Sequence, residues 1–124
     1  MPTANKKVLA VVDDLFFVVK INDMAKRNGF QIEFLKSEKD VLTKARELPS
    51  LIIVDLNSTS VKPVPLISKL KADPDTKSVN IISFVSHVQG ELKQQAQDAG
   101  CNMVLARSAF STNLPQIFKR HSNS

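Results

Sequence analysis

The sequence predicts an α/β protein, a doubly wound three-layer sandwich in which helices cover both faces of a five-stranded parallel sheet. Apolar runs alternate with amphipathic stretches five times along the chain, which is typical of strand–helix units. Three of these runs are nearly continuous in apolar residues, as expected for strands buried on both faces of a parallel sheet. The length of 124 residues fits one domain over positions 1–124.

Five segments have the composition of strands. They are Lys7–Val12, Phe30–Leu35, Leu51–Leu56, Asn80–Val85 and Asn102–Ala106. The third is the most informative, because four apolar residues run directly into Asp55. A carboxylate is therefore expected where that strand leaves the core.

Amphipathic stretches between and after the strands predict five helices. Ser37 is a good N-cap for the second helix, and Gly100 closes the fourth. Asn113 is expected to cap the last helix, with Pro115 in its first turn, where proline is tolerated. The expected helices are Leu15–Asn28, Glu38–Leu48, Pro65–Ala72, Gly90–Ala99 and Leu114–His121.

Composition limits the classes of function. The formal net charge is +5, but the basic residues are spread along the chain and there is no Trp or Tyr to stack on bases, so a nucleic-acid-binding surface is not expected. The single cysteine, Cys101, cannot pair within the chain and suits a reducing compartment such as the cytoplasm. We see no signal peptide and no segment long enough to span a membrane.

Ligands of this fold class bind at the carboxyl ends of the strands. Three carboxylates in one place cannot all stay ionised without a cation, and oxygen ligands of this kind suit magnesium. A carboxylate can also act as a nucleophile and form an aspartyl-phosphate. Each acid has a simpler alternative, which is to cap a turn or the next helix. The side chains expected at this edge are Asp13, Asp14, Asp55, Ser86, His87 and Arg107.

Four segments, VLAVVDD, LIIVDL, IISFVS and GCNMVLAR, resemble the signature segments of the response-regulator receiver domain. The resemblance covers about Lys7 to His121. It implies a flavodoxin-like fold with strand order 2-1-3-4-5, as in chemotaxis receivers. It also implies a role in two-component signalling, by phosphorelay from a histidine kinase or phosphotransferase.

The resemblance assigns roles to individual residues. Asp13 and Asp14 match the acidic pair that holds magnesium, and Asp55 matches the phosphoacceptor, which also contacts the metal. Asn57 matches the position whose backbone carbonyl completes the metal site. Ser86 matches the hydroxyl residue that contacts the phosphoryl group.

The fifth segment departs from the receiver pattern. Receivers carry Lys-Pro with a cis bond where this chain has Arg107-Ser108. Arginine keeps the positive charge for contact with a phosphoryl group, but it is longer and planar. The alternative for Arg107 is a surface or structural ion pair, with one of the acids as a candidate partner. A cis bond before serine would cost about 3 kcal/mol, so we expect a trans bond and a shifted loop. Val104 replaces the usual rotating aromatic, and His87 follows Ser86, where it could narrow the pocket.

The first expected helix has more apolar residues than one face needs. Phe17 and Ile21 fill the inward face, whereas Leu15, Phe16 and Val19 fall partly off that stripe. Clustered exposed apolar side chains mark interaction surfaces, and receivers dock phosphodonors beside their first helix. We therefore expect a partner surface here, with a wide buried face as the alternative.

Two functions follow from these observations. The first is a stand-alone receiver that accepts a phosphoryl group on Asp55 with magnesium and signals to a downstream protein by contact. The alternative is a pseudo-receiver, the same fold acting as a phosphorylation-independent interaction module. We do not expect an enzyme, because the motif of aspartyl phosphatases, an acid two residues after another acid, is missing after the first strand.

Overall fold

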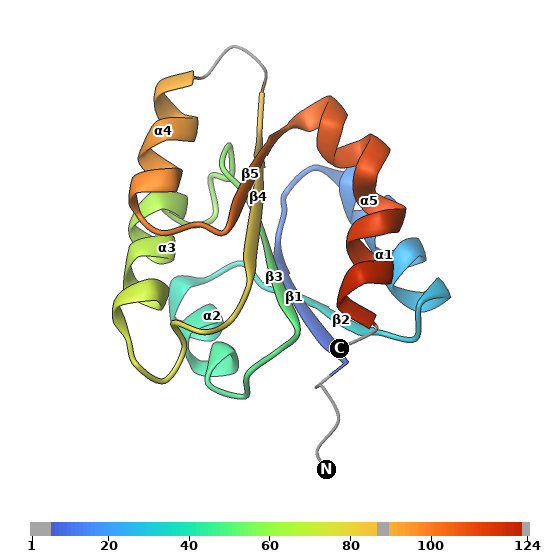
Figure 1. Cartoon of the computed structure of the whole chain (residues 1–124), viewed down its shortest axis with the longest axis horizontal. Helices are drawn as coiled ribbons and strands as arrows, with labels where there is room; N and C mark the ends of the chain where they lie inside the picture. The colour runs from blue at the N-terminus through green and yellow to red at the C-terminus, as the bar shows by residue number, and fades with distance from the viewer. Residues whose placement is uncertain (1–5, 87–89, 123–124) are drawn as a thin grey trace.

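The structure is a computed structural model that describes residues 6–86 and 90–122, in which five strands and five helices alternate (Figure 1). The strands are β1 (Lys7–Val11), β2 (Gln31–Phe34), β3 (Leu51–Asp55), β4 (Ile81–Val85) and β5 (Met103–Ala106). The helices are α1 (Leu15–Arg27), α2 (Glu38–Ala45), α3 (Pro63–Ala72), α4 (Gly90–Asp98) and α5 (Arg107–Ser122). None of these helices is long and apolar enough to cross a membrane.

The strands form one parallel sheet in the order β2-β1-β3-β4-β5, which confirms the expected topology and the flavodoxin-like fold. Helices α1 and α5 cover one face, and α2, α3 and α4 cover the other (Figure 1). The central strands β1 and β3 pair with Val11 opposite Val54. This register brings the segments that follow the two strands to the same edge of the sheet.

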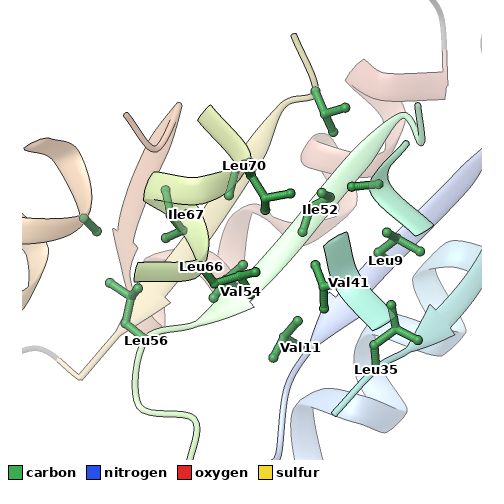
Figure 2. Packing of buried hydrophobic residues seen from close by; sticks show 14 of the residues in the cluster. Leu9, Val11, Leu35, Val41, Ile52, Val54, Leu56, Leu66, Ile67 and Leu70 are labelled. Carbon is green, nitrogen blue, oxygen red and sulfur yellow. The ribbon is translucent and has the colours of Figure 1, made fainter. Parts of the chain in front are cut away.

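Side chains of β1 and β3 alternate between two apolar layers, as the pleat of a strand requires. Leu9 and Val11, with Ile52 and Val54, face the layer under α2 and α3 (Figure 2). The residues between them, among them Ala10, pack under α1 and α5. Since both faces of these strands are buried, a one-residue slip would exchange the two layers, and the register is strongly specified.

The last helix differs most from the expectation. It begins at Arg107 rather than at Leu114, so Pro115 lies inside it. Asn113 is not its N-cap, and its side-chain amide donates a hydrogen bond to the carbonyl of Ala109 at 2.8 Å. The reason is Phe110, which is fully buried and stacks on Phe84 with ring centroids 4.5 Å apart. This anchor extends the apolar stripe of the helix toward its N-terminus, past the local signals of Asn113 and Pro115.

The other element bounds differ from the expected ones by three residues at most. Ser37 caps α2, because its hydroxyl oxygen accepts the N–H of Asp40 at 3.1 Å. Gly100 follows α4 with φ 103°, a conformation that favours glycine. Both caps confirm the sequence predictions.

Candidate functional site at the carboxyl edge of the sheet

Three acids meet where β1 and β3 end, as predicted. Asp13 and Asp14 follow β1, and Asp55 is the last residue of β3. Burial raises the pKa of Asp55 above its ordinary value of 3.8, and the charges of Asp13 and Asp14 raise it further. The N–H of Asn57 and the charge of Arg107 act against this rise. The three acids are therefore close enough for their charges to interact.

Asp55 is the most enclosed of these acids, with 5% of its surface exposed. Its Oδ1 accepts the backbone N–H of Asn57 at 2.9 Å, and its carbonyl accepts the N–H of Ser58 at 3.0 Å. These bonds close the turn after β3. The alternative in which Asp55 caps a turn is thus confirmed, and its use as a phosphoacceptor stays a prediction.

Asp14 is engaged by two different groups. Its Oδ1 accepts the N–H of Phe16 at 2.8 Å and caps α1, and its Oδ2 forms an ion pair with the guanidinium of Arg107. The guanidinium also stands over the ring of Phe17, 4.7 Å from its centroid. The hydrogen bond from Arg107 lowers the pKa of Asp14. Asp14 is therefore both a helix cap and the anion of an ion pair.

Asp13 holds the loop between β3 and α3. Its Oδ2 accepts the N–H of Thr59 at 2.8 Å and the hydroxyl of Ser58 at 3.1 Å, and its Oδ1 accepts the hydroxyl of Ser60 at 2.8 Å. Lys36 approaches the same carboxylate at 3.8 Å. Burial alone would raise the pKa of Asp13, but these hydrogen bonds outweigh it and lower the pKa.

The carboxylates in this arrangement do not fit a divalent cation. Within the described ranges, no group of three or more His, Cys, Asp or Glu side chains is placed to hold a metal ion. Magnesium needs carboxylate oxygens that can turn toward it in near-octahedral geometry. Asp13 and Asp14 instead direct their oxygens to the loop and to Arg107. The residues expected to hold magnesium therefore share one edge, but the carboxylates of Asp13 and Asp14 are bound to other groups of the chain, and magnesium binding stays a prediction.

The remaining predicted site residues are Ser86, Arg107 and His87. Ser86 reaches the site through Asn57, whose side-chain oxygen accepts the backbone N–H of Ser86 at 3.1 Å and its hydroxyl at 3.3 Å. Arg107 reaches it through Asp14. All described peptide bonds are trans, including the bond between Arg107 and Ser108, as expected. His87 lies outside the described residues.

An open cavity of about 430 Å³ adjoins the ion pair, between the starts of α1 and α5. The ammonium of Lys20 donates a hydrogen bond at 2.5 Å to the hydroxyl of Ser111, which is one of the lining residues. Lys20 and Ser111 were not predicted from the sequence, although each lies one helical turn after a predicted site residue, Phe16 and Arg107 respectively. The cavity is lined by Phe16, Phe17, Ser86, Arg107, Ser108 and Ser111.

Three apolar side chains of α1 are exposed, and one of them, Phe16, lines this cavity. Leu15 is 77% exposed, Phe16 62% and Val19 68%. The prediction that these three residues lie off the buried stripe of α1 is confirmed, and the alternative of a wide buried face is wrong. We call Leu15, Phe16 and Val19 the α1 patch.

Comparison with solved structures places this geometry in a known fold. No protein-family model and no curated protein matches the chain. The receiver domain of the sensor histidine kinase PA1611 from Pseudomonas aeruginosa, with a magnesium ion coordinated in its active site cleft, covers 98% of this chain and 100% of its own, at 19% identity and a TM-score of 0.79. The chemotaxis response regulator CheY4 of Vibrio cholerae covers 96% of this chain and 99% of its own, at 21% identity and a TM-score of 0.78. The chain has the receiver-domain fold.

A third solved structure of this receiver fold is the phosphorylated cyanobacterial phytochrome response regulator RcpA, at 19% identity and a TM-score of 0.74, which covers 94% of this chain and 91% of its own. At such identities the likeness shows the fold alone. The side chains of this receiver fold must therefore be interpreted individually. Val104, for example, is a buried member of the apolar layer under α2, α3 and α4, so β5 carries no aromatic side chain at this point.

Proposed function

We propose that this chain signals by protein contact, as a phosphorylation-independent interaction module built on the receiver fold. The ion pair between Asp14 and Arg107 carries this proposal. Asp14 stands where the resemblance puts a magnesium ligand, and Arg107 stands where it puts the cation that contacts the phosphoryl group. In this chain each of the two charges is satisfied by the other.

The environment of Asp55 supports the same function. A carboxylate nucleophile must be ionised, and burial, which raises the pKa of Asp55, works against its ionisation. Phosphoryl transfer also needs cations that offset the charge on the transferring group. Here Arg107 is bound to Asp14, and the acids are not arranged around a metal.

The α1 patch is the surface through which we expect contact. Large apolar side chains that cluster on a surface mark interaction sites in proteins of this size. Phe16 also borders the cavity at the start of α5. The partner that we propose is a histidine kinase, a phosphotransferase or a downstream signalling protein. The cytoplasmic location suggested by the single cysteine stays a prediction.

One observation favours phosphoacceptance on Asp55 as a second candidate function. Asp55 ends β3, and Asn57 links it to Ser86 by hydrogen bonds. This is the placement that the resemblance assigns to a phosphoacceptor and its contacting hydroxyl. The magnesium of this candidate would be held by Asp13, Asp14, Asp55 and the carbonyl of Asn57. It could bind only after Arg107 has released Asp14 and the loop has released Asp13.

Phosphorylation by a small-molecule donor separates the two functions. The protein is incubated with acetyl phosphate and magnesium, and the intact mass is recorded beside that of Asp55→Asn. The proposed function predicts no phosphoryl adduct on either protein. An adduct on the wild type that is absent from Asp55→Asn would establish the second candidate instead.

Contact through the α1 patch needs its own experiment, made in the native host. Phe16→Ser should abolish co-purification of the partner, whereas Asp55→Asn should retain it. Leu48→Asn is a matched control, because Leu48 is also a large exposed apolar residue, at 51% exposure, but lies after α2. Loss of the partner with Asp55→Asn, or its retention with Phe16→Ser, would contradict the proposal.

A further inference from the structure

The acidic edge of the sheet carries its own cations. Arg107 is bound to Asp14, and Lys36 lies 3.8 Å from Asp13. The charge of Arg107 also lowers the pKa of Asp55 against the effect of burial. Positive side chains of this chain therefore offset the charges of acids that would otherwise repel one another.

We propose that Arg107 is a tethered counter-ion that takes the place of a divalent cation at this edge and excludes such a cation from it. A divalent ion can bind only where carboxylate oxygens are available, and the Oδ2 of Asp14 is bound to the guanidinium. The positive charge of Arg107 would also repel an ion that approaches Asp55. This inference goes beyond the proposed function, because exclusion of the cation does not require a partner.

The position of Arg107 explains why the guanidinium prevails over a free ion. Arg107 is the first residue of α5, so its backbone is fixed by a helix that Phe110 anchors in the core. Its planar guanidinium lies over the ring of Phe17 while it binds Asp14, and arginine suits both contacts. A tethered group acts at an effective concentration on the order of millimolar or above. A free cation competes with the guanidinium at this effective concentration, so a weakly binding cation at a lower concentration does not displace it.

Substitution of Arg107 tests the proposal directly, with manganese as the probe because its binding is followed by electron paramagnetic resonance. Wild-type protein should show no bound manganese at the concentrations at which variants of Arg107 bind it. Arg107→Gln removes the charge and should bind manganese about tenfold or more tightly than the wild type, since a neighbouring cation weakens proton binding at a carboxylate by a comparable factor. The melting temperature of Arg107→Gln should rise with added magnesium, because only the folded state assembles the site.

Two further variants keep the test decisive. Arg107→Gln combined with Asp14→Asn should lose the gained affinity, because asparagine keeps the cap of α1 but removes the charged ligand. Arg107→Met keeps an apolar contact with Phe17 and replaces Arg107→Gln if the latter does not fold. Manganese binding by the wild type that Asp14→Asn abolishes, or no binding by any variant at Arg107, would overturn the proposal. Neither result depends on whether Asp55 accepts a phosphoryl group.

Discussion

Asp14 and Arg107 are 93 positions apart in the sequence, and their side chains form an ion pair that joins the start of α1 to the start of α5. The pair lies at the edge of the sheet where Asp55 ends β3. The family resemblance assigns the two residues separate roles, Asp14 as a magnesium ligand and Arg107 as the cation that contacts the phosphoryl group. The proposed role of this protein as a contact module depends on this ion pair.

Two substitutions at Asp14 should separate the stability that its helix cap contributes from the stability that its ion pair with Arg107 contributes. Asp14→Asn loses the charge but keeps an oxygen for the N–H of Phe16, and it should cost about 1 kcal/mol or less, as partly exposed ion pairs do. Asp14→Ala loses both functions and should cost about 1 kcal/mol more. Urea unfolding measures both values. Equal costs for the two variants would show that the hydrogen bond to Phe16 does not stabilise α1.

Asp55 should lower the stability of the folded protein as the pH rises. Burial raises its pKa above 3.8, so the folded state holds the proton more tightly than the unfolded chain does. The stabilisation from this proton is complete below 3.8 and is lost as the pH rises through the raised pKa. Asp55→Asn should therefore match the wild type in acid and exceed its stability at neutral pH. Urea unfolding across this pH range measures the difference.

Asp13→Asn is the control for that measurement, and the opposite sign is expected. Hydrogen bonds from the loop after β3 lower the pKa of Asp13 against the effect of burial. Its stabilisation is therefore present above the ordinary value of 3.8 and is lost as the pH falls through the lowered pKa. Asp13→Asn should be less stable than the wild type at neutral pH, and this deficit should shrink in acid. The same sign for both variants would show that the environments of the two acids are not as described.

Replacement of Pro115 tests where α5 begins. In the middle of a helix, proline removes a hydrogen bond to the carbonyl four residues earlier, which is that of Ser111. Pro115→Ala restores this donor and should raise the free energy of unfolding by about 1 to 3 kcal/mol, measured in urea. If the helix began at Leu114, Pro115 would lie in its first turn and the substitution would bring no gain.

Adjacent phenylalanines in α1 should respond very differently to truncation. Phe17 is 1% exposed, and its ring lies 4.8 Å from that of Phe84, so Phe17→Ala should cost about 3 to 5 kcal/mol. Phe16→Ala should cost about 1 kcal/mol or less, because its ring is largely in solvent. Thermal or urea unfolding measures both. A large cost at Phe16 would mean that its ring is buried and unavailable to a partner.

The fold could be predicted from the sequence because its strongest signals are local. Nearly continuous apolar runs such as Leu51–Val54 show which strands are buried on both faces. The parallel topology that follows brings the acids after β1 and β3 to one edge. The start of α5 could not be predicted in this way, because Asn113 and Pro115 are strong local signals, whereas Phe110 is decisive only through its contact with Phe84.

The residues of the candidate site were found from the sequence, and so was the cap of α1 by one of the acids, but which acid Arg107 would bind was not. An aspartate at position 14 could serve as a helix cap or as a metal ligand. Only the position of Arg107 in the folded protein shows which of these roles its carboxylate can take. Asp13 was assigned to a metal, although hydroxyl side chains follow β3 closely at Ser58, Thr59 and Ser60. A run of hydroxyl side chains near a strand end indicates that the loop can donate hydrogen bonds to a neighbouring carboxylate.

The most direct test of the central claim is a crystal structure of the protein grown with millimolar magnesium. We expect the guanidinium of Arg107 to remain on Asp14 and over the ring of Phe17, with no ion between Asp14 and Asp55. A magnesium ion bound by Asp14 and Asp55, with Arg107 turned away from both, would contradict it.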